Sequence, residues 1–278
     1  MPDSLTDEGF HPRDESGSSG TVLADAPRAV VDIQRLTKSF TRNDQTLQVL
    51  SDISMSLAPG QSGSIIGPSG CGKSTLLRIL AGLELYDSGH VAIMGTAVGK
   101  PRQDVGFMFQ GLALIPWRTV LQNIRLPAEL LRMDRATVSE RLPKCIDLVG
   151  LTGFEQYHLR EISGGMRQRV ALARMLMADA KLLLLDEPFS SLDELTRESI
   201  DLLFMDVCLR AQTVFLMVTH NIFEAVLMSD KVFVMSPAPA RILDVVDVTL
   251  QSPRTKQAMD DPHFMDSVRK VRRILEMA

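Results

Sequence analysis

The chain has 278 residues, a formal net charge of −4 and 45% hydrophobic residues, which allows a sizeable buried core. The slightly acidic balance gives no support for nucleic acid as the main partner. The three cysteines (Cys71, Cys145 and Cys208) are widely spaced and form no Cys-x-x-Cys pair, so we expect neither a zinc site nor a disulfide framework.

The first 28 residues lack any core-forming pattern. They are rich in Asp, Glu, Ser, Gly and Pro and include Ser-Gly-Ser-Ser-Gly at 16–20, a composition typical of a disordered tail. The opening residues are acidic, unlike a signal peptide. No apolar run along the chain approaches the ~18 residues that a membrane helix needs. We therefore expect a disordered tail over 1–28 and a protein that stays inside the cell.

Two apolar stretches predict strands before the first chemical motif. One begins after Ala29 and ends at Phe40, and the other covers residues 49–57. Phe40 either packs in the core or stacks on a nucleotide base, and the sequence alone leaves both interpretations open. A Pro59-Gly60 turn then leads into a short apolar strand at Ile65-Ile66.

Residues 67–75 fit the phosphate-loop pattern G-x-x-x-x-G-K-[S/T], between that strand and a helix-like run at 76–81. Glycines let the backbone wrap a phosphate, and its N–H groups, together with the helix start, attract anions. Lys73 is expected to bind the β- and γ-phosphates, and the Ser74 hydroxyl to ligate Mg²⁺. The predicted nucleotide-binding residues here are Gly67, Pro68, Ser69, Gly70, Cys71, Gly72, Lys73, Ser74 and Thr75.

The middle of the chain predicts a change from strands to helices. Strands are expected at 89–98 and 105–109, and the second leads into Gln110. An apolar loop at 112–118 contains Trp117, the only tryptophan, and is either a packed core loop or an exposed docking surface. From Val120 to about Tyr157 the apolar spacing is helical, which predicts a helical insertion in an α/β domain.

Ser163, Gly164 and Gly165 stand at the start of the next predicted helix. A Ser-Gly-Gly sequence at this position is either an ordinary N-cap or a second helix start suited to bind phosphate. On its own the sequence favours the ordinary N-cap.

Leu182–Leu185 is fully apolar, which predicts a strand buried on both faces of a parallel sheet. Asp186 and Glu187 follow at its carboxyl end, where α/β folds bind their ligands. We expect Asp186 in the Mg²⁺ shell and Glu187 to orient and deprotonate the attacking water. The alternative is that two carboxylates simply end a strand.

After a helix from Glu194 to Arg210, a second buried strand at 213–218 leads to His220. This histidine is either structural or, if the two buried strands are parallel neighbours, contacts the γ-phosphate. A last helix carries Phe264, Val268, Val271 and Leu275 on one face and basic residues on the other. It either packs on its own domain or contacts anionic lipid.

Taken in order, these motifs resemble the ATP-binding cassette (ABC) ATPases over residues 30 to about 240, and the Ser-Gly-Gly stretch is the most specific part. The resemblance implies an α/β phosphate-loop NTPase core of mostly parallel sheet, with an antiparallel β subdomain and a helical insertion. It implies that Ser163, Gly164 and Gly165 of one subunit close on ATP bound by a second, and that Asp193 bridges the dimer. The dimer would be a homodimer or a pair with a similar subunit. The resemblance also implies that Gln110 senses Mg²⁺ and the γ-phosphate.

The same resemblance implies that Phe40 stacks on adenine and that ATP and Mg²⁺ are the cofactors. Two residues depart from the family's commoner pattern: Met166 replaces Gln, and Phe40 replaces Tyr. Neither change removes a charged or metal-binding group. The implied organisation is a 1–28 tail, an ATPase domain at 29–250 with a helical subdomain at about 120–175, and a helical extension at 251–278.

A narrower resemblance concerns residues 114–120 and 235–242, which look like the ATPase subunits of nitrate/sulfonate/taurine importers. It implies uptake of a small anionic solute through a separate membrane permease that is served by a periplasmic or extracellular solute-binding protein. The chain would then sit at the cytoplasmic face of the inner membrane. An ABC exporter ATPase and an ABC ATPase without a transport role are the alternatives.

Overall fold

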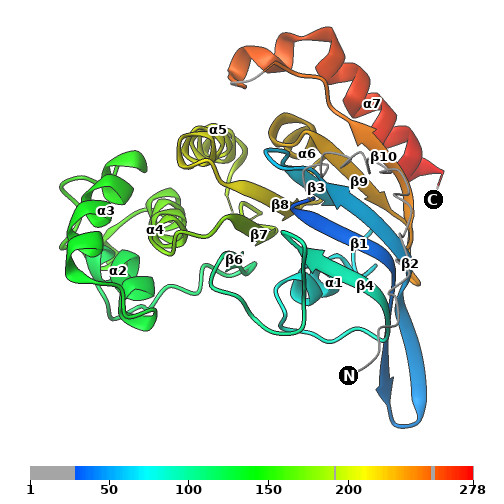
Figure 1. Cartoon of the computed structure of the whole chain (residues 1–278). Coiled ribbons are helices and arrows are strands. Elements are labelled where there is room, and N and C mark those ends of the chain that lie inside the picture. Colours follow the sequence, from blue (N-terminus) through cyan, green and yellow to red (C-terminus); the bar gives the residue numbers. More distant parts are fainter. Residues whose placement is uncertain (1–28, 191, 252–253, 278) are drawn as a thin grey trace, which may run out of the picture.

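The computed structural model describes residues 29–190, 192–251 and 254–277. Two β-sheets form the core, and most of the helices lie around the larger sheet or in a lobe beyond its edge (Figure 1). The predicted tail at 1–28 lies outside the described residues. No helix in the described ranges is long and apolar enough to cross a membrane.

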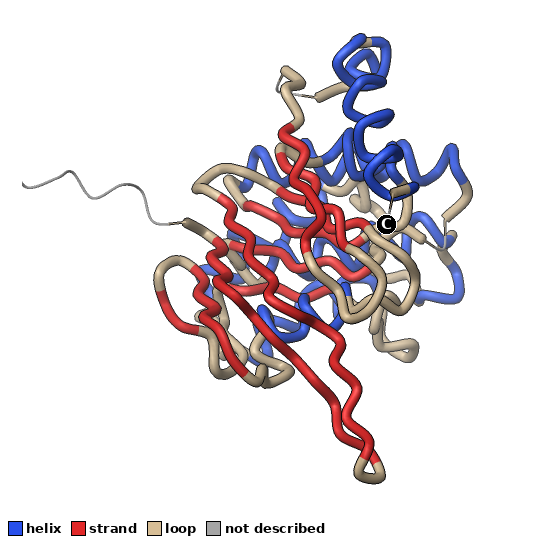
Figure 2. Tube along the Cα trace, turned by 90° about the vertical axis from the view of Figure 1, so that its right-hand side faces the viewer, coloured by secondary structure: helices blue, strands red, loops and turns tan. Residues whose placement is uncertain are grey.

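The smaller sheet is antiparallel and has the strand order β2-β1-β4-β5. Its strands are β1 (Val31–Arg42), β2 (Gln45–Leu57), β4 (Ser88–Ile93) and β5 (Thr96–Ala97). The β1–β2 hairpin projects well beyond the sheet (Figure 2). The strand predicted at 89–98 is two strands, because Gly95 has a positive φ of 72° and reverses the chain between them.

The larger sheet has the order β10-β9-β3-β8-β7-β6, and all its pairs are parallel except β10 with β9. Its strands are β3 (Gly63–Ile66), β6 (Val105–Met108), β7 (Leu182–Asp186), β8 (Val214–Val218), β9 (Lys231–Met235) and β10 (Ile242–Asp247). Along β7, Leu182 and Leu184 enter one hydrophobic core, and Leu183 and Leu185 enter the other. The apolar run is thus explained by burial on both faces.

Helices connect these strands and form the lobe. Those next to the sheet are α1 (Lys73–Leu80), α5 (Glu194–Ala211) and α6 (Ile222–Met228). The lobe contains α2 (Val120–Leu130), α3 (Arg135–Leu148), the 3₁₀ helix η1 (Leu159–Glu161) and α4 (Gly164–Met177). Helix α4 contacts α2 and α3 in the lobe and α5 and β6 in the core, so it connects the two parts (Figure 1).

The C-terminal segment contains η2 (Lys256–Asp260) and α7 (Pro262–Glu276). Phe264, Val268 and Val271 of α7 are buried, and the helix packs against α6, β9 and β10. The apolar face of α7 therefore docks on its own domain, as one of the two sequence interpretations expected.

Candidate active site

The loop between β3 and α1 requires its glycines. Gly70 and Gly72 have φ values of 76° and 115°, which side-chain-bearing residues rarely adopt. A Cβ atom on Gly72 would come within 2.7 Å of Val49, and one on Gly67 within 2.8 Å of the Met235 carbonyl oxygen. The loop is therefore packed tightly against its surroundings.

Lys73 folds back over this loop. Its Nζ donates hydrogen bonds to the carbonyl oxygens of Gly67 and Pro68, at 2.8 Å each, and the residue is only 6% exposed. Within the loop, burial raises the pKa of the Cys71 thiol, although the nearby Lys73 charge opposes this effect. The ammonium group of Lys73 thus lies where a phosphate wrapped by the loop would need a counter-charge.

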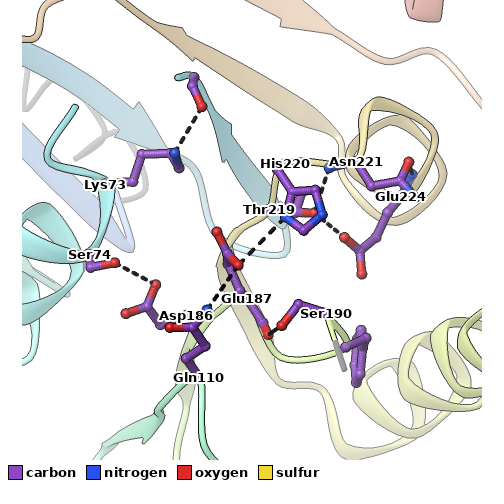
Figure 3. Close-up of polar contacts among 12 residues, drawn as sticks. Lys73, Ser74, Gln110, Asp186, Glu187, Ser190, Thr219, His220, Asn221 and Glu224 are labelled. Atoms are coloured by element: carbon purple, nitrogen blue, oxygen red, sulfur yellow. Dashed lines mark hydrogen bonds and ion pairs between the residues drawn. The ribbon is translucent and has the colours of Figure 1, made fainter. Parts of the chain in front are cut away.

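Ser74 and Asp186 meet at the end of β7. The Ser74 Oγ donates to Asp186 Oδ1 at 2.8 Å (Figure 3), and burial raises the pKa of this carboxyl group despite that bond. The described residues contain no cluster of three His, Cys, Asp or Glu side chains that could hold a metal. One hydroxyl and one carboxylate fit Mg²⁺, which usually binds through one or two protein groups and completes its shell with phosphate oxygens and water.

Glu187 is the meeting point of the predicted catalytic side chains. Because β7 and β8 are parallel neighbours, their carboxyl ends lie side by side, with Asp186 opposite Val218. Glu187 Oε2 accepts a hydrogen bond from Gln110 Nε2 at 3.3 Å and lies 3.6 Å from His220 Nδ1 (Figure 3). The structure therefore brings Gln110, Glu187 and His220 together.

The Glu187 backbone has a positive φ of 49°, and its N–H donates to the Val218 carbonyl oxygen at 2.9 Å. A left-handed conformation at a non-glycine residue costs about 1–3 kcal/mol and is kept where the surroundings enforce it. Glu187 adopts this left-handed conformation directly after the end of β7, and its side chain contacts Gln110 and His220.

Phe40 lies at the surface with 40% of its area exposed, which excludes a fully buried core position. The Lys38 Nζ lies 4.5 Å from the centre of its ring, and the same ammonium pairs with Glu84 at 2.7 Å. The ring is thus held by a cation–π contact while part of it remains open to a planar ligand.

Ser163 and Asp193 are both helix N-caps. The Ser163 Oγ accepts from the Met166 N–H at 3.2 Å, and Asp193 Oδ1 accepts from the Thr196 N–H at 3.0 Å. Both residues are exposed. In the part of the chain that the structure describes, no hydrogen bond joins Ser163 or Asp193 to Lys73 or Glu187. The N-cap interpretation holds within one chain, and a role on the ATP of a second chain stays a prediction.

The loop that follows Gln110 exposes its tryptophan. Trp117 is 76% exposed, so this side chain is not part of a packed core. Arg118 pairs with Glu129 of α2 at 2.8 Å, and Arg174 of α4 donates to the carbonyl oxygens of Leu112 and Ala113. The loop is therefore fixed to the helical lobe while Trp117 faces outwards.

Sequence reasoning missed two side chains that hold the segment after Glu187, the buried Gln168 and the partly exposed Arg197. Gln168 of α4 donates to the Pro188 carbonyl oxygen, and Arg197 of α5 donates to those of Phe189 and Leu192. A polar residue buried within an otherwise apolar helix face is the signal that identifies Gln168, which is 1% exposed.

Residues 50–190 match the family described as ABC transporter. The aliphatic sulfonates import ATP-binding protein SsuB of Bacillus cereus is 42% identical over 226 residues, which cover 81% of this chain and 89% of the relative. The chain belongs to the ATP-binding subunits of ABC transporters. Its fold class and its activity as an ATPase coupled to transport, both predicted from the sequence, are confirmed.

Other ABC relatives support the same membership. The taurine import ATP-binding protein TauB of Burkholderia pseudomallei is 38% identical, with coverage of 84% of this chain and 92% of the relative. The nitrate import ATP-binding protein NrtC of Synechococcus elongatus is 44% identical, over 78% of this chain and 34% of that longer protein.

Among solved ABC structures, the dimeric cassette MJ0796 in a post-hydrolysis state bound to ADP and Pi is 27% identical, with a TM-score of 0.67. The similarity covers 78% of this chain and 98% of that one. CbiO1 from Clostridium perfringens has a TM-score of 0.72 over 90% of this chain and 98% of that one, and at 23% identity it supports the fold alone. A dimeric arrangement is thus known for a cassette of this fold.

Proposed function

We propose that this chain is the ATPase subunit of an ABC importer that takes up a small anionic solute. The observation that carries the enzymatic part is the convergence of Gln110, Glu187 and His220 next to the Ser74–Asp186 pair. The importer part rests on relatives named as importers of sulfonates, nitrate and taurine. In those relatives the named solutes are small, and sulfonate and nitrate are anions.

In this proposal Glu187 orients the attacking water and removes its proton, a role that typically contributes about 10²–10⁴ in rate. His220, at the end of the neighbouring strand β8, contacts the γ-phosphate. Gln110 senses the γ-phosphate and Mg²⁺. Lys73 and the loop N–H groups neutralise charge on the phosphates. Ser74, Asp186 and Gln110 would hold Mg²⁺, which neutralises further phosphate charge when it is bound.

The site on one chain is incomplete in this proposal. Ser163, Gly164 and Gly165 of a second copy would cover the ATP, with Asp193 at the contact between the two copies. The exposed Ser163 and Asp193 and the dimeric cassette MJ0796 support this arrangement. Two ATP molecules would then lie between two identical subunits.

Trp117 and the neighbouring lobe would receive the membrane permease, which places the chain at the cytoplasmic face of the inner membrane. The solute-binding protein would act through that permease. The fixed loop and the 76% exposure of Trp117 support a docking surface at this position.

Coexpression with the neighbouring permease and solute-binding-protein genes tests the proposal. We expect the subunits to copurify and solute uptake to require ATP, whereas Trp117→Ala should reduce copurification strongly. Exposed Leu47→Ala on the β1–β2 hairpin, outside the lobe, is the control substitution, and ATP binding by each variant checks its folding. Copurification with ribosomes or DNA instead of the permease would contradict the importer assignment, and outward solute movement would favour an exporter.

A further inference from the structure

Two buried carboxyl groups lie on α5 and α6, two helices that contact each other. Glu224 of α6 is 6% exposed, and Asp201 of α5 is 4% exposed. Asp201 Oδ1 has no hydrogen-bond partner among the residues that the structure describes. Burial of an ionised carboxylate without a partner is costly, so one of the two groups is expected to be neutral.

Glu224 controls the backbone around His220 through one hydroxyl group. The Thr219 Oγ donates to Glu224 Oε2 and accepts the Asn221 N–H at 3.0 Å, so both neighbours of His220 belong to this network (Figure 3). On the opposite side of the histidine, its Nδ1 lies 3.6 Å from Glu187. A displacement of Thr219 would therefore move His220 relative to Glu187.

The charged groups around the pair are few. Arg197 is the cation that acts on both carboxyl groups, but its guanidinium donates to the Phe189 and Leu192 carbonyl oxygens. Glu198 of α5 pairs with Lys256 at 3.0 Å and adds a negative charge near Asp201. His220 and Glu187 lie beyond Thr219 and act on Glu224 with opposite sign. Among the residues that the structure describes, Arg197 is thus the cation shared by the two buried carboxyl groups.

The pKa values of Asp201 and Glu224 are both raised, but their surroundings differ. Burial, and then the charge of Glu224, raise the pKa of Asp201 to about 8. Burial also raises the pKa of Glu224, and the hydrogen bond from Thr219 opposes this effect. Asp201 is therefore expected to keep its proton at neutral pH. Glu224 Oε2 is the oxygen that accepts from the Thr219 hydroxyl.

We propose that Glu224 is a positioning residue for ATP hydrolysis, and that it holds Thr219 and His220 in place only while the neighbouring Asp201 is protonated. This inference rests on the role proposed for His220. Ionisation of Asp201 would add a negative charge to the surroundings of Glu224 and weaken its hold on Thr219.

Steady-state ATPase assays of the full chain test the positioning role. Glu224→Leu and Thr219→Val should each lower kcat about tenfold, the effect expected from the loss of one charge-assisted hydrogen bond, with the KM for ATP nearly unchanged. The kcat of the double variant should be no lower than the kcat of either single variant. Glu224→Gln should keep most of the wild-type kcat, since its amide oxygen still accepts from the Thr219 hydroxyl. Additive losses, or an unchanged kcat in Thr219→Val, would overturn the proposal.

The pH dependence of kcat tests the part played by Asp201. The wild-type kcat should fall with a midpoint near pH 8, and this fall should be absent in Asp201→Asn. Exposed Asp206→Asn on the same helix is the matched control and should keep the wild-type profile. Identical pH profiles of kcat for Asp201→Asn and wild type would show that Asp201 does not affect the position of His220.

His220→Ala separates failure of this inference from failure of the proposed function. If His220→Ala keeps full kcat, the role proposed for His220 is wrong, and the positioning proposal fails with it. If His220→Ala loses turnover while Thr219→Val does not, only the positioning proposal fails. Thr219→Val and Asp201→Asn change few atoms, so they decide the question even if Glu224→Leu does not fold.

Discussion

At the scale of single residues, the site combines groups held rigidly with groups open to solvent. Glu187 is fixed by a strained backbone and by the Val218 carbonyl oxygen, whereas the His220 side chain is 57% exposed. Phe40 has both properties, because Lys38 holds its ring while 40% of the residue remains accessible. We therefore expect the Phe40 ring to be available for stacking on a base.

Phe40→Ala is expected to raise the KM for ATP about tenfold or more, since stacking of a base on an aromatic side chain contributes about 1–3 kcal/mol. Phe40→Tyr should bind ATP like the wild type because it keeps the ring. Titration with a fluorescent ATP analogue measures the affinity. Leu209→Ala is the control, as Leu209 is an exposed apolar residue on α5, outside the β1–β2 hairpin. Equal affinity for Phe40→Ala and wild type would show that adenine binds elsewhere.

At the scale of helices and strands, sequence patterns predicted the strands that are buried on both faces. The apolar runs of β7 and β8 predicted two buried parallel strands. Asp186, Glu187 and His220 therefore follow the carboxyl ends of two neighbouring strands. Strand β10 was missed because Asp244 and Asp247 interrupt its apolar residues, and edge strands tolerate such residues. Asp201 was missed because an isolated aspartate in a helix usually faces water, and only tertiary packing buries it.

The raised pKa of Asp201 makes the stability of this α5–α6 region depend on pH. The folded protein holds the Asp201 proton up to about pH 8, whereas the unfolded chain releases it near the ordinary value of 3.8. The contribution of this group to stability is therefore complete below about pH 4 and is lost as the pH rises to about 8.

Asp201→Asn removes this dependence because its amide group does not titrate. We expect the variant to gain stability over the wild type as the pH rises from 5 to 8, by at most about 1.4 kcal/mol per pH unit. Urea denaturation at several pH values measures the difference, with Asp206→Asn as the control. A constant difference across this range would mean that Asp201 is ionised in the folded protein.

At the scale of the whole molecule, the Ser163 helix start is exposed, and in the described part of the chain it makes no hydrogen bond to the phosphate loop. Ser163, Gly164 and Asp193 are exposed, as expected of groups that meet a second subunit. Helix α4 runs from Ser163 at its N-cap past buried Gln168, which binds the Pro188 carbonyl oxygen next to Glu187. In the proposed dimer, α4 would therefore connect the Ser163 of one subunit with the segment that follows its own Glu187.

The most direct test of this account is the oligomeric state and turnover of Glu187→Gln. The variant keeps the geometry of the side chain but cannot act as a general base, so kcat should fall about 10²–10⁴-fold while ATP binding is retained. Light scattering should then show a dimer with ATP and a monomer without it, and adding Ser163→Arg should abolish the dimer. Wild-type turnover in Glu187→Gln, or a monomer with bound ATP, would contradict the account.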